Sequence, residues 1–274
     1  MIAPPWLPGV AVRRWISVPV GAWLLVNADG EFLFPRGTVV VQHHTVAKTA
    51  APFETHVFTF DGDAAHSRLA RAAAYRWTAV PADDPKLVNE AALAPLPGDD
   101  ARRWLSPAAE RELNLDLSVA GFVLPLSPRQ LDAKQPALWQ TRGWLAPDHP
   151  LTCAEAPRLA ALDDTSASPE LRVRSYLDAN CAACHRPGGP GRGNFDARFV
   201  APFSAAELTS AALVAGDLGI TGAKLVLPGA PEKSVLHARL VRTDALRMPA
   251  ISLSDESAPV APLLAEWIGG LLRE

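Results

Sequence analysis

The sequence predicts an α+β protein in which a β-rich N-terminal domain precedes an all-α C-terminal domain. Three observations lead to this prediction. Short β-branched and aromatic runs separated by Gly and Pro dominate the first part of the chain. Apolar residues recur at helical spacing in the last part, and a Pro-interrupted segment lies between the two. We therefore expect three regions, at residues 1–100, 101–165 and 166–274.

The β-branched and aromatic runs of the N-terminal region predict several short strands in a small sheet or sandwich. These runs occupy residues 32–34, 38–41, 56–60 and 75–77. An Asn-Ala-Asp-Gly segment at residues 27–30 is typical of a hairpin turn. The 26 prolines of the chain favour short elements and ordered loops over long helices.

Three helices are predicted in the C-terminal region. The first begins at Ser168, which is followed by Pro and Glu and therefore has the pattern of a helix N-cap. A second, short helix is expected over residues 231–240, and a third from near Asp255, with apolar residues at helical spacing beyond it. The Ser-Pro pattern at residues 106–107 also predicts a helix start in the middle region.

The charge and hydropathy of the chain exclude two classes of partner. A net charge of −3 gives no case for binding nucleic acid or an anionic membrane surface, which require basic patches. The longest apolar run near the start, residues 15–26, is interrupted by Pro and Gly and is too short to span a bilayer. It also lacks a small-residue cleavage site, so we do not interpret it as a signal peptide.

Cys181, Cys184 and His185 form a Cys-X-X-Cys-His motif, the attachment pattern of haem c. Two thiols at this spacing, at the end of a predicted helix, can each add to one vinyl group of the same porphyrin, and the adjacent imidazole then points at the iron. A redox dithiol is expected between the strands and helix of a β-α-β unit, which this region does not suggest. A zinc site would need a further ligand, and the chain, with 3 cysteines, has no second cysteine pair. We expect one covalent haem c in an all-α domain of the class I cytochrome c type.

A six-coordinate haem iron needs a second axial ligand, usually Met or His. Met248 is the only methionine after Met1, and it lies before a proline on a loop ahead of the last predicted helix. We expect His185 and Met248 to ligate the iron. His237 is the alternative to Met248, and it would give a lower reduction potential because a thioether favours ferrous iron more than a second imidazole does.

Other candidate residues receive more ordinary interpretations. His43 and His44 are adjacent on a predicted strand, so they point to opposite faces and cannot share one metal ion. Cys153 is expected to be an inert thiol. A backbone carbonyl near Pro187 or Pro190 is a candidate acceptor for the imidazole N–H of the haem-ligating histidine.

The chain resembles a family of bacterial dihaem c-type cytochromes that occur beside, or fused to, PQQ-dependent sugar-dehydrogenase-like proteins. The resemblance is most specific after residue 174. The matching segments there are residues 174–189, 194–198, 228–234, 247–249 and 264–268. Weaker matches in the first part are residues 13–19, 34–40, 121–124 and 129–131. The resemblance implies that His185 and Met248 are the axial pair.

One departure from the family pattern concerns the first of its two haem motifs. Glu112 and Leu115 stand where the family has the two cysteines, and Asp116 stands where it has the histidine. A carboxylate and a leucine cannot form thioether bonds. We therefore expect residues 101–165 to contain a degenerate first haem segment and a linker, and the protein to be a monohaem relative of a dihaem family.

One-electron transfer is the leading functional hypothesis, because a His/Met haem changes oxidation state without opening a coordination position. The resemblance implies a redox partner, such as a quinoprotein dehydrogenase or a larger electron-transfer complex. Covalent haem implies a periplasmic or otherwise exported protein whose signal peptide is absent from this chain. The first alternative is an accessory or structural haem subunit of a redox or membrane complex. The second is an enzyme whose iron binds a small molecule or peroxide, although we expect an electron carrier or subunit rather than an oxidoreductase.

Overall fold

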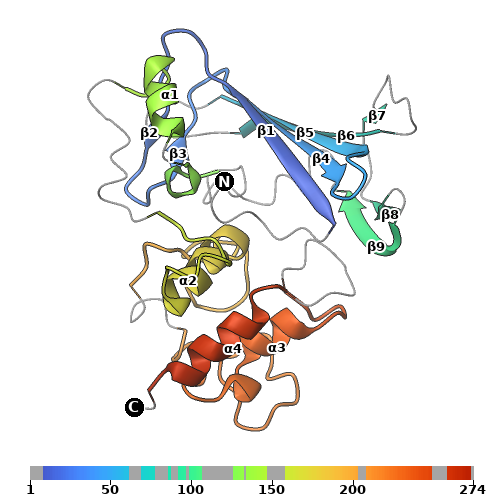
Figure 1. Ribbon diagram of the computed structural model, residues 1–274, viewed down its shortest axis with the longest axis vertical. Helices are drawn as coiled ribbons and strands as arrows, with labels where there is room; N and C mark the ends of the chain where they lie inside the picture. The colour runs from blue at the N-terminus through green and yellow to red at the C-terminus, as the bar shows by residue number, and fades with distance from the viewer. Residues whose placement is uncertain are drawn as a thin grey trace. The chain divides into compact units, whose positions relative to one another are not determined.

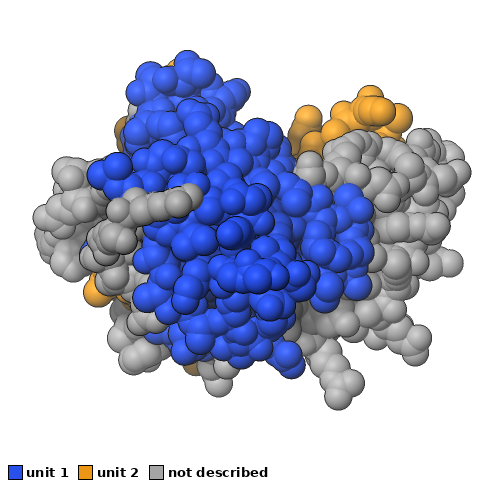
Figure 2. Space-filling view, turned by 90° about the horizontal axis from the view of Figure 1, so that it is seen from below, with its two compact units in different colours: residues 1–6, 156–251, 256–274 blue, residues 7–155, 252–255 orange. Residues whose placement is uncertain are grey.

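The structure is a computed structural model, in which the described residues form two compact units that we treat separately. The described residues are 9–61, 69–77, 86–87, 92–96, 99–106, 126–132, 134–146, 158–202, 208–248 and 258–272. Those up to residue 146 belong to the N-terminal unit, and those from residue 158 belong to the C-terminal unit. Figure 1 labels the helices and strands, and Figure 2 shows the N-terminal unit in orange and the C-terminal unit in blue.

An antiparallel sheet is the main element of the N-terminal unit (Figure 1). Its strand order is β1-β4-β5-β6-β7. The strands are β1 (Val10–Ser17), β4 (Val39–Val46), β5 (Pro52–Phe60), β6 (Leu69–Arg76) and β7 (Lys86–Leu87). Two small sheets pair β2 (Leu25–Val26) with β3 (Phe32–Leu33), and β8 (Ala92–Leu96) with β9 (Asp99–Ser106). The unit also contains the 3-10 helix η2 (Pro128–Gln130) and the helix α1 (Gln135–Thr141).

Local sequence signals in this unit give the structures that we predicted from them. The turn at residues 27–30 joins β2 to β3, with the Gly30 N–H donating to the Asn27 carbonyl at 2.9 Å. Gly30 has a φ of 74°, which is the conformation that favours glycine. The predicted runs at residues 38–41 and 56–60 fall largely or wholly within β4 and β5.

The main sheet has one buried face and one face that is partly open to solvent, because burial alternates along β4 and along most of β5. His43 and His44 point to opposite faces, as predicted. On the buried face, the cross-strand partners His44 and Glu54 lie beside His56, whose Nε2 is 2.6 Å from Glu54 Oε1. Burial lowers the pKa of His44 well below its usual value, and the charges of His56 and Arg14 lower it further.

Three α-helices in the described part of the C-terminal unit pack around an apolar cluster. They are α2 (Pro169–Asn180), α3 (Val235–Val241) and α4 (Ala261–Gly270), and α4 contacts both of the others (Figure 1). Ser168 caps α2 as predicted, because its side-chain oxygen accepts a hydrogen bond from the Leu171 N–H at 3.2 Å. The apolar residues that α4 contributes to the core are Ala261, Leu263, Leu264, Trp267 and Ile268.

The prediction of an all-α C-terminal domain of the class I cytochrome c type is wrong. The helices α2, α3 and α4 have only 12, 7 and 10 residues. Turns and loops make up most of the other described residues of this unit, with a short 3-10 helix, η4 (Pro231–Lys233), and an isolated parallel bridge between Lys224 and Ser234. Frequent Gly and Pro explain the difference, because the segments 187–193 and 216–231 cannot continue a helix.

Candidate functional site

The cysteine motif forms one additional turn directly after α2. The helix ends at Asn180, and the Cys181 N–H still donates to the Leu177 carbonyl at 2.8 Å. The Cys181 carbonyl then accepts from the Cys184 N–H at 3.1 Å and from the His185 N–H at 2.8 Å. This turn therefore holds both thiols and the imidazole on a single short segment at the end of a capped helix.

Both cysteines of the motif are free thiols, and neither is activated. Cys181 is buried and Cys184 is partly buried. Burial raises the pKa of Cys181 to about 12, with a further contribution from the charge of Cys184, and burial also raises the pKa of Cys184. A catalytic dithiol requires the opposite, a lowered pKa that makes one sulfur a thiolate. These thiols therefore do not have the chemistry of a redox dithiol.

The imidazole of His185 is half-buried and stacked on a neighbouring ring. Its ring centroid lies 4.4 Å from that of Phe195, and the two planes are 22° apart. The His185 carbonyl accepts a hydrogen bond from the Ala197 N–H at 2.9 Å. Burial lowers the pKa of His185, and the charge of Arg239 lowers it further. The imidazole is therefore neutral at physiological pH, which is the form that can ligate a metal.

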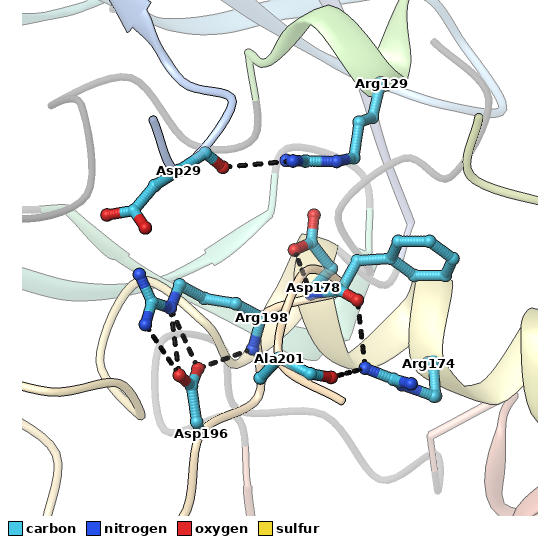
Figure 3. Close-up of polar contacts among 8 residues, drawn as sticks. Asp29, Arg129, Arg174, Asp178, Asp196, Arg198 and Ala201 are labelled. Carbon is cyan, nitrogen blue, oxygen red and sulfur yellow. Dashed lines mark hydrogen bonds and ion pairs between the residues drawn. The ribbon is translucent and has the colours of Figure 1, made fainter. Parts of the chain in front are cut away.

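Two charged side chains of α2 fasten the loop that carries Phe195 (Figure 3). The Phe199 N–H donates to Asp178 Oδ1 at 2.7 Å. The Arg174 guanidinium donates to the Phe199 carbonyl at 2.9 Å and also to the Ala201 carbonyl. The helix that presents the cysteine motif thus also fixes the loop whose aromatic ring supports His185.

An ion pair stiffens the same loop. Arg198 donates to Asp196 Oδ2 at 2.7 Å (Figure 3), and the Arg198 N–H bonds to Asp196 Oδ1 at 3.0 Å. Burial alone would raise the pKa of Asp196, but the hydrogen bonds from Arg198 outweigh it and the net pKa lies below the usual value. Asp196 is therefore a structural carboxylate that stays ionised, and it has no role as a proton donor.

The glycine-rich loop after His185 closes against the cysteine motif. The Gly191 N–H donates to the Cys184 carbonyl at 2.8 Å. A Cβ at Gly189 or Gly191 would lie 2.4 Å or 2.6 Å from that carbonyl oxygen, so only glycine fits at either position. The Nδ1 of His185 is buried beside Gly191 and has no hydrogen-bond partner among the described residues. The predicted carbonyl acceptor near Pro187 or Pro190 is therefore not found there.

Met248 is half-buried, and Arg239, a residue of α3, holds its backbone. The Met248 N–H donates to the Arg239 carbonyl at 3.1 Å, and Arg239 Nη1 donates to the Leu246 carbonyl at 2.8 Å. The charge of the same guanidinium lowers the pKa of His185. Arg239 therefore holds the segment that carries Met248, the predicted second axial ligand. His237, the alternative ligand, is a half-buried residue of α3 whose pKa is lowered by burial.

The residues of the motif and its surroundings include the groups that a covalent haem would require. Among the described residues, no group of three or more His, Cys, Asp or Glu side chains is arranged to hold a metal ion. A zinc site needs about four such ligands. A haem c instead needs two free thiols, one neutral imidazole and an apolar surround. Cys181 belongs to the buried apolar cluster that includes Phe195, Leu264 and Trp267.

Several residues of interest lie outside the described part of the chain. These are Cys153 and the three residues of the degenerate first motif, Glu112, Leu115 and Asp116. In the described part, sequence reasoning missed Tyr176, which belongs to the same apolar cluster as Cys181, and Arg239, whose charge lowers the pKa of His185. For Tyr176, the available signal was its position shortly before Cys181 on the same helix. For Arg239, which lies on α3, the sequence gives no such signal.

Comparisons with protein-family models, curated proteins and solved structures found no match to this chain. The resemblance to dihaem c-type cytochromes therefore stays a prediction that rests on the sequence motifs. No helix in the part of the chain that the structure describes is long and apolar enough to cross a membrane.

Proposed function

We propose that this chain is a monohaem c-type cytochrome that carries out one-electron transfer. The observation that carries the proposal is the turn at residues 181–185, which joins two free thiols and a neutral imidazole on one segment after α2. The Cys-X-X-Cys-His spacing is the attachment pattern of haem c, and the raised thiol pKa values argue against a redox dithiol.

In this proposal, each residue of the site has one task. Cys181 and Cys184 hold the porphyrin through thioether bonds, and His185 and Met248 ligate the iron. When bound, the haem supplies a reversible one-electron change at its iron. Phe195 fixes the plane of the imidazole through the 4.4 Å stacking contact. Burial keeps the imidazole neutral, so its lone pair is available for the metal.

The proposal includes a single haem per chain, a redox protein as partner and an exported location. The single haem follows from Glu112, Leu115 and Asp116, which replace the first motif of the family that the sequence resembles. A quinoprotein dehydrogenase or a larger electron-transfer complex is the proposed partner. Because haem c is normally attached outside the bacterial cytoplasmic membrane, we place the protein in the periplasm or at another exported site.

A count of covalent haem tests the proposal directly. The chain would be produced together with the haem c maturation machinery, and a pyridine haemochrome assay would give the haem per chain. We expect one haem in the unmodified chain and in the matched control Cys153→Ala, and none in the double variant Cys181→Ala with Cys184→Ala. Absence of covalent haem from the unmodified chain would refute the cytochrome proposal. Two haems per chain would refute only the monohaem part.

The identity of the second axial ligand needs a separate pair of variants. A thioether-ligated ferric haem has a characteristic long-wavelength charge-transfer band, which a bis-histidine haem lacks. We expect Met248→Ala to abolish this band and to let the iron bind an added imidazole, whereas His237→Ala keeps both properties of the unmodified protein. An unmodified protein that lacks this band, and whose iron binds added imidazole only in the His237→Ala variant, would assign the ligand to His237 and leave the rest of the proposal intact.

A further inference from the structure

The loop that leads to Met248 is largely open to solvent. Residues 243–246 are exposed, and only Arg247 is buried, so burial contributes little to holding most of the loop. The Asp244 carboxylate accepts a hydrogen bond from the Leu246 N–H at 3.0 Å, and its carbonyl accepts one from the Arg247 N–H at 3.1 Å. These bonds shape the loop but join it to no other element. The position of Met248 therefore depends on bonds from the loop to its neighbours.

The backbone of Arg239, in the last turn of α3, makes one such bond. Its carbonyl accepts a hydrogen bond from the Met248 N–H at 3.1 Å. The carbonyls in the last turn of a helix have no partner within the helix and need one from outside. The Met248 N–H supplies that partner. This single bond therefore satisfies the end of α3 and fixes the backbone of the proposed axial ligand.

The side chain of Arg239 joins the same loop to a third segment. Its Nη1 donates to the Leu246 carbonyl at 2.8 Å, and its Nη2 donates to the Ala215 carbonyl at 3.1 Å. Ala215 lies in a turn that the Gly216 N–H closes by donating to the Leu213 carbonyl at 3.1 Å. A charged donor makes stronger hydrogen bonds than a neutral one, and the planar guanidinium can serve two acceptors in fixed directions. Arg239 therefore fastens the loop both to α3 and to this turn.

We propose that Arg239 is a positioning residue for the second axial ligand and that its bonds to the loop keep small molecules away from the iron. This inference rests on the proposed function, because it requires a haem with Met248 as a ligand. An added ligand can bind the iron only when Met248 has left it, so its apparent affinity rises with the population of that released state. The bonds from Arg239 keep this population small. They thereby favour electron transfer over ligand binding at the iron.

Two substitutions in the full holoprotein separate the bonds of Arg239 from its charge. Arg239→Lys keeps the charge but lacks the planar fork that serves two carbonyls, and Arg239→Gln removes both. The matched control is Arg172→Gln, because Arg172 is a half-buried arginine of α2 whose Nε likewise donates to a loop carbonyl, that of Leu162, at 2.7 Å. The readouts are the haem count, the charge-transfer band of the thioether-ligated ferric iron, the affinity for added imidazole and the hydrogen-exchange rate of the Met248 N–H.

We expect both Arg239 variants to keep one haem per chain and to weaken the charge-transfer band. Loss of the charged hydrogen bonds should raise the population of the released state, so imidazole should bind at least about tenfold more tightly than in the unmodified protein. The Met248 N–H should exchange faster by a similar factor, because the loop opens more often. Arg172→Gln should match the unmodified protein in all four readouts. If Arg239→Gln does not fold, Arg239→Lys decides alone.

The outcomes separate this inference from the function on which it rests. A full haem count with unchanged imidazole affinity and unchanged Met248 exchange in the Arg239 variants overturns the inference and leaves the cytochrome proposal standing. An altered Arg239→Gln beside an unaltered Arg239→Lys would assign the effect to charge and would also overturn it. The same holds for a change of equal size in Arg172→Gln, which would show a general effect of losing such an arginine. An unmodified chain without covalent haem overturns both proposals.

Discussion

Gly191→Ala measures how closely the glycine-rich loop must approach the cysteine motif. A Cβ at this position would lie 2.6 Å from the Cys184 carbonyl oxygen, 2.8 Å from its carbonyl carbon and 2.9 Å from His185 Nδ1. Two of these atoms belong to the backbone and cannot rotate away. The loop must therefore retreat and lengthen the 2.8 Å hydrogen bond from the Gly191 N–H to the same carbonyl. Overpacking of this kind costs about 1–3 kcal/mol, and we expect a loss of that size in the free energy of unfolding.

Urea unfolding followed by circular dichroism gives this free energy for the variant and for a matched control. Gly269, within α4, is the control because a Cβ there would meet no atom within 4 Å. Replacing a glycine inside a helix by alanine typically stabilises by roughly 0.5–1 kcal/mol, so Gly269→Ala should move the midpoint upwards. The same urea midpoint in Gly191→Ala as in the unmodified chain would refute the close approach of the loop.

Two further predictions concern single polar contacts. Asp178→Ala should destabilise by about 1.5–3 kcal/mol, because it removes a charged acceptor from the Phe199 N–H; Asp178→Asn should lose less in the same urea titration, and equal losses would contradict this role. The second prediction concerns His44, whose pKa lies well below the usual 6.5 because of burial and then the charges of His56 and Arg14. The unfolded chain therefore binds a proton that the folded chain does not, so stability should fall as the pH drops below about 6.5. Urea midpoints at pH values of about 7.5 and 5.5 should differ less in His44→Gln, and an unchanged difference would argue against His44 as the source.

Local signals were sufficient for the parts of the fold that depend on a few neighbouring residues. The cap at Ser168 requires only a hydroxyl and the first turn that follows it, and the turn at residues 27–30 requires only a glycine with positive φ. By contrast, β1 was not predicted. Its residues do alternate in burial, but Arg13 and Arg14 interrupt the apolar pattern, and only pairing with β4 identifies the strand.

The errors in the C-terminal unit have a common physical cause. We predicted an all-α domain because helices are expected beside the cysteine motif. Gly and Pro, however, interrupt the rest of this region repeatedly and prevent further helices. The helix expected from residue 231 begins at Val235, because Pro231–Lys233 forms a 3-10 turn and Ser234 is extended.

In the candidate site, too, sequence motifs predicted some residues and missed others. A contiguous motif identifies Cys181, Cys184 and His185. Tyr176 precedes Cys181 on the same helix, so the sequence could have indicated it, whereas no spacing rule relates Arg239 of α3 to His185. That relation arises when segments far apart in the sequence pack together, and sequence alone does not report such packing.

The burial of Cys181 has a consequence for the order of events in biogenesis. In the folded chain this thiol is covered and has a pKa raised to about 12, so it is protonated at neutral pH. A protonated, buried sulfur reacts slowly and is inaccessible to an enzyme that would attach the haem. On the proposed function, the cofactor must therefore be joined to a still-open chain, and chains that fold before this step would accumulate as colourless, stable by-products.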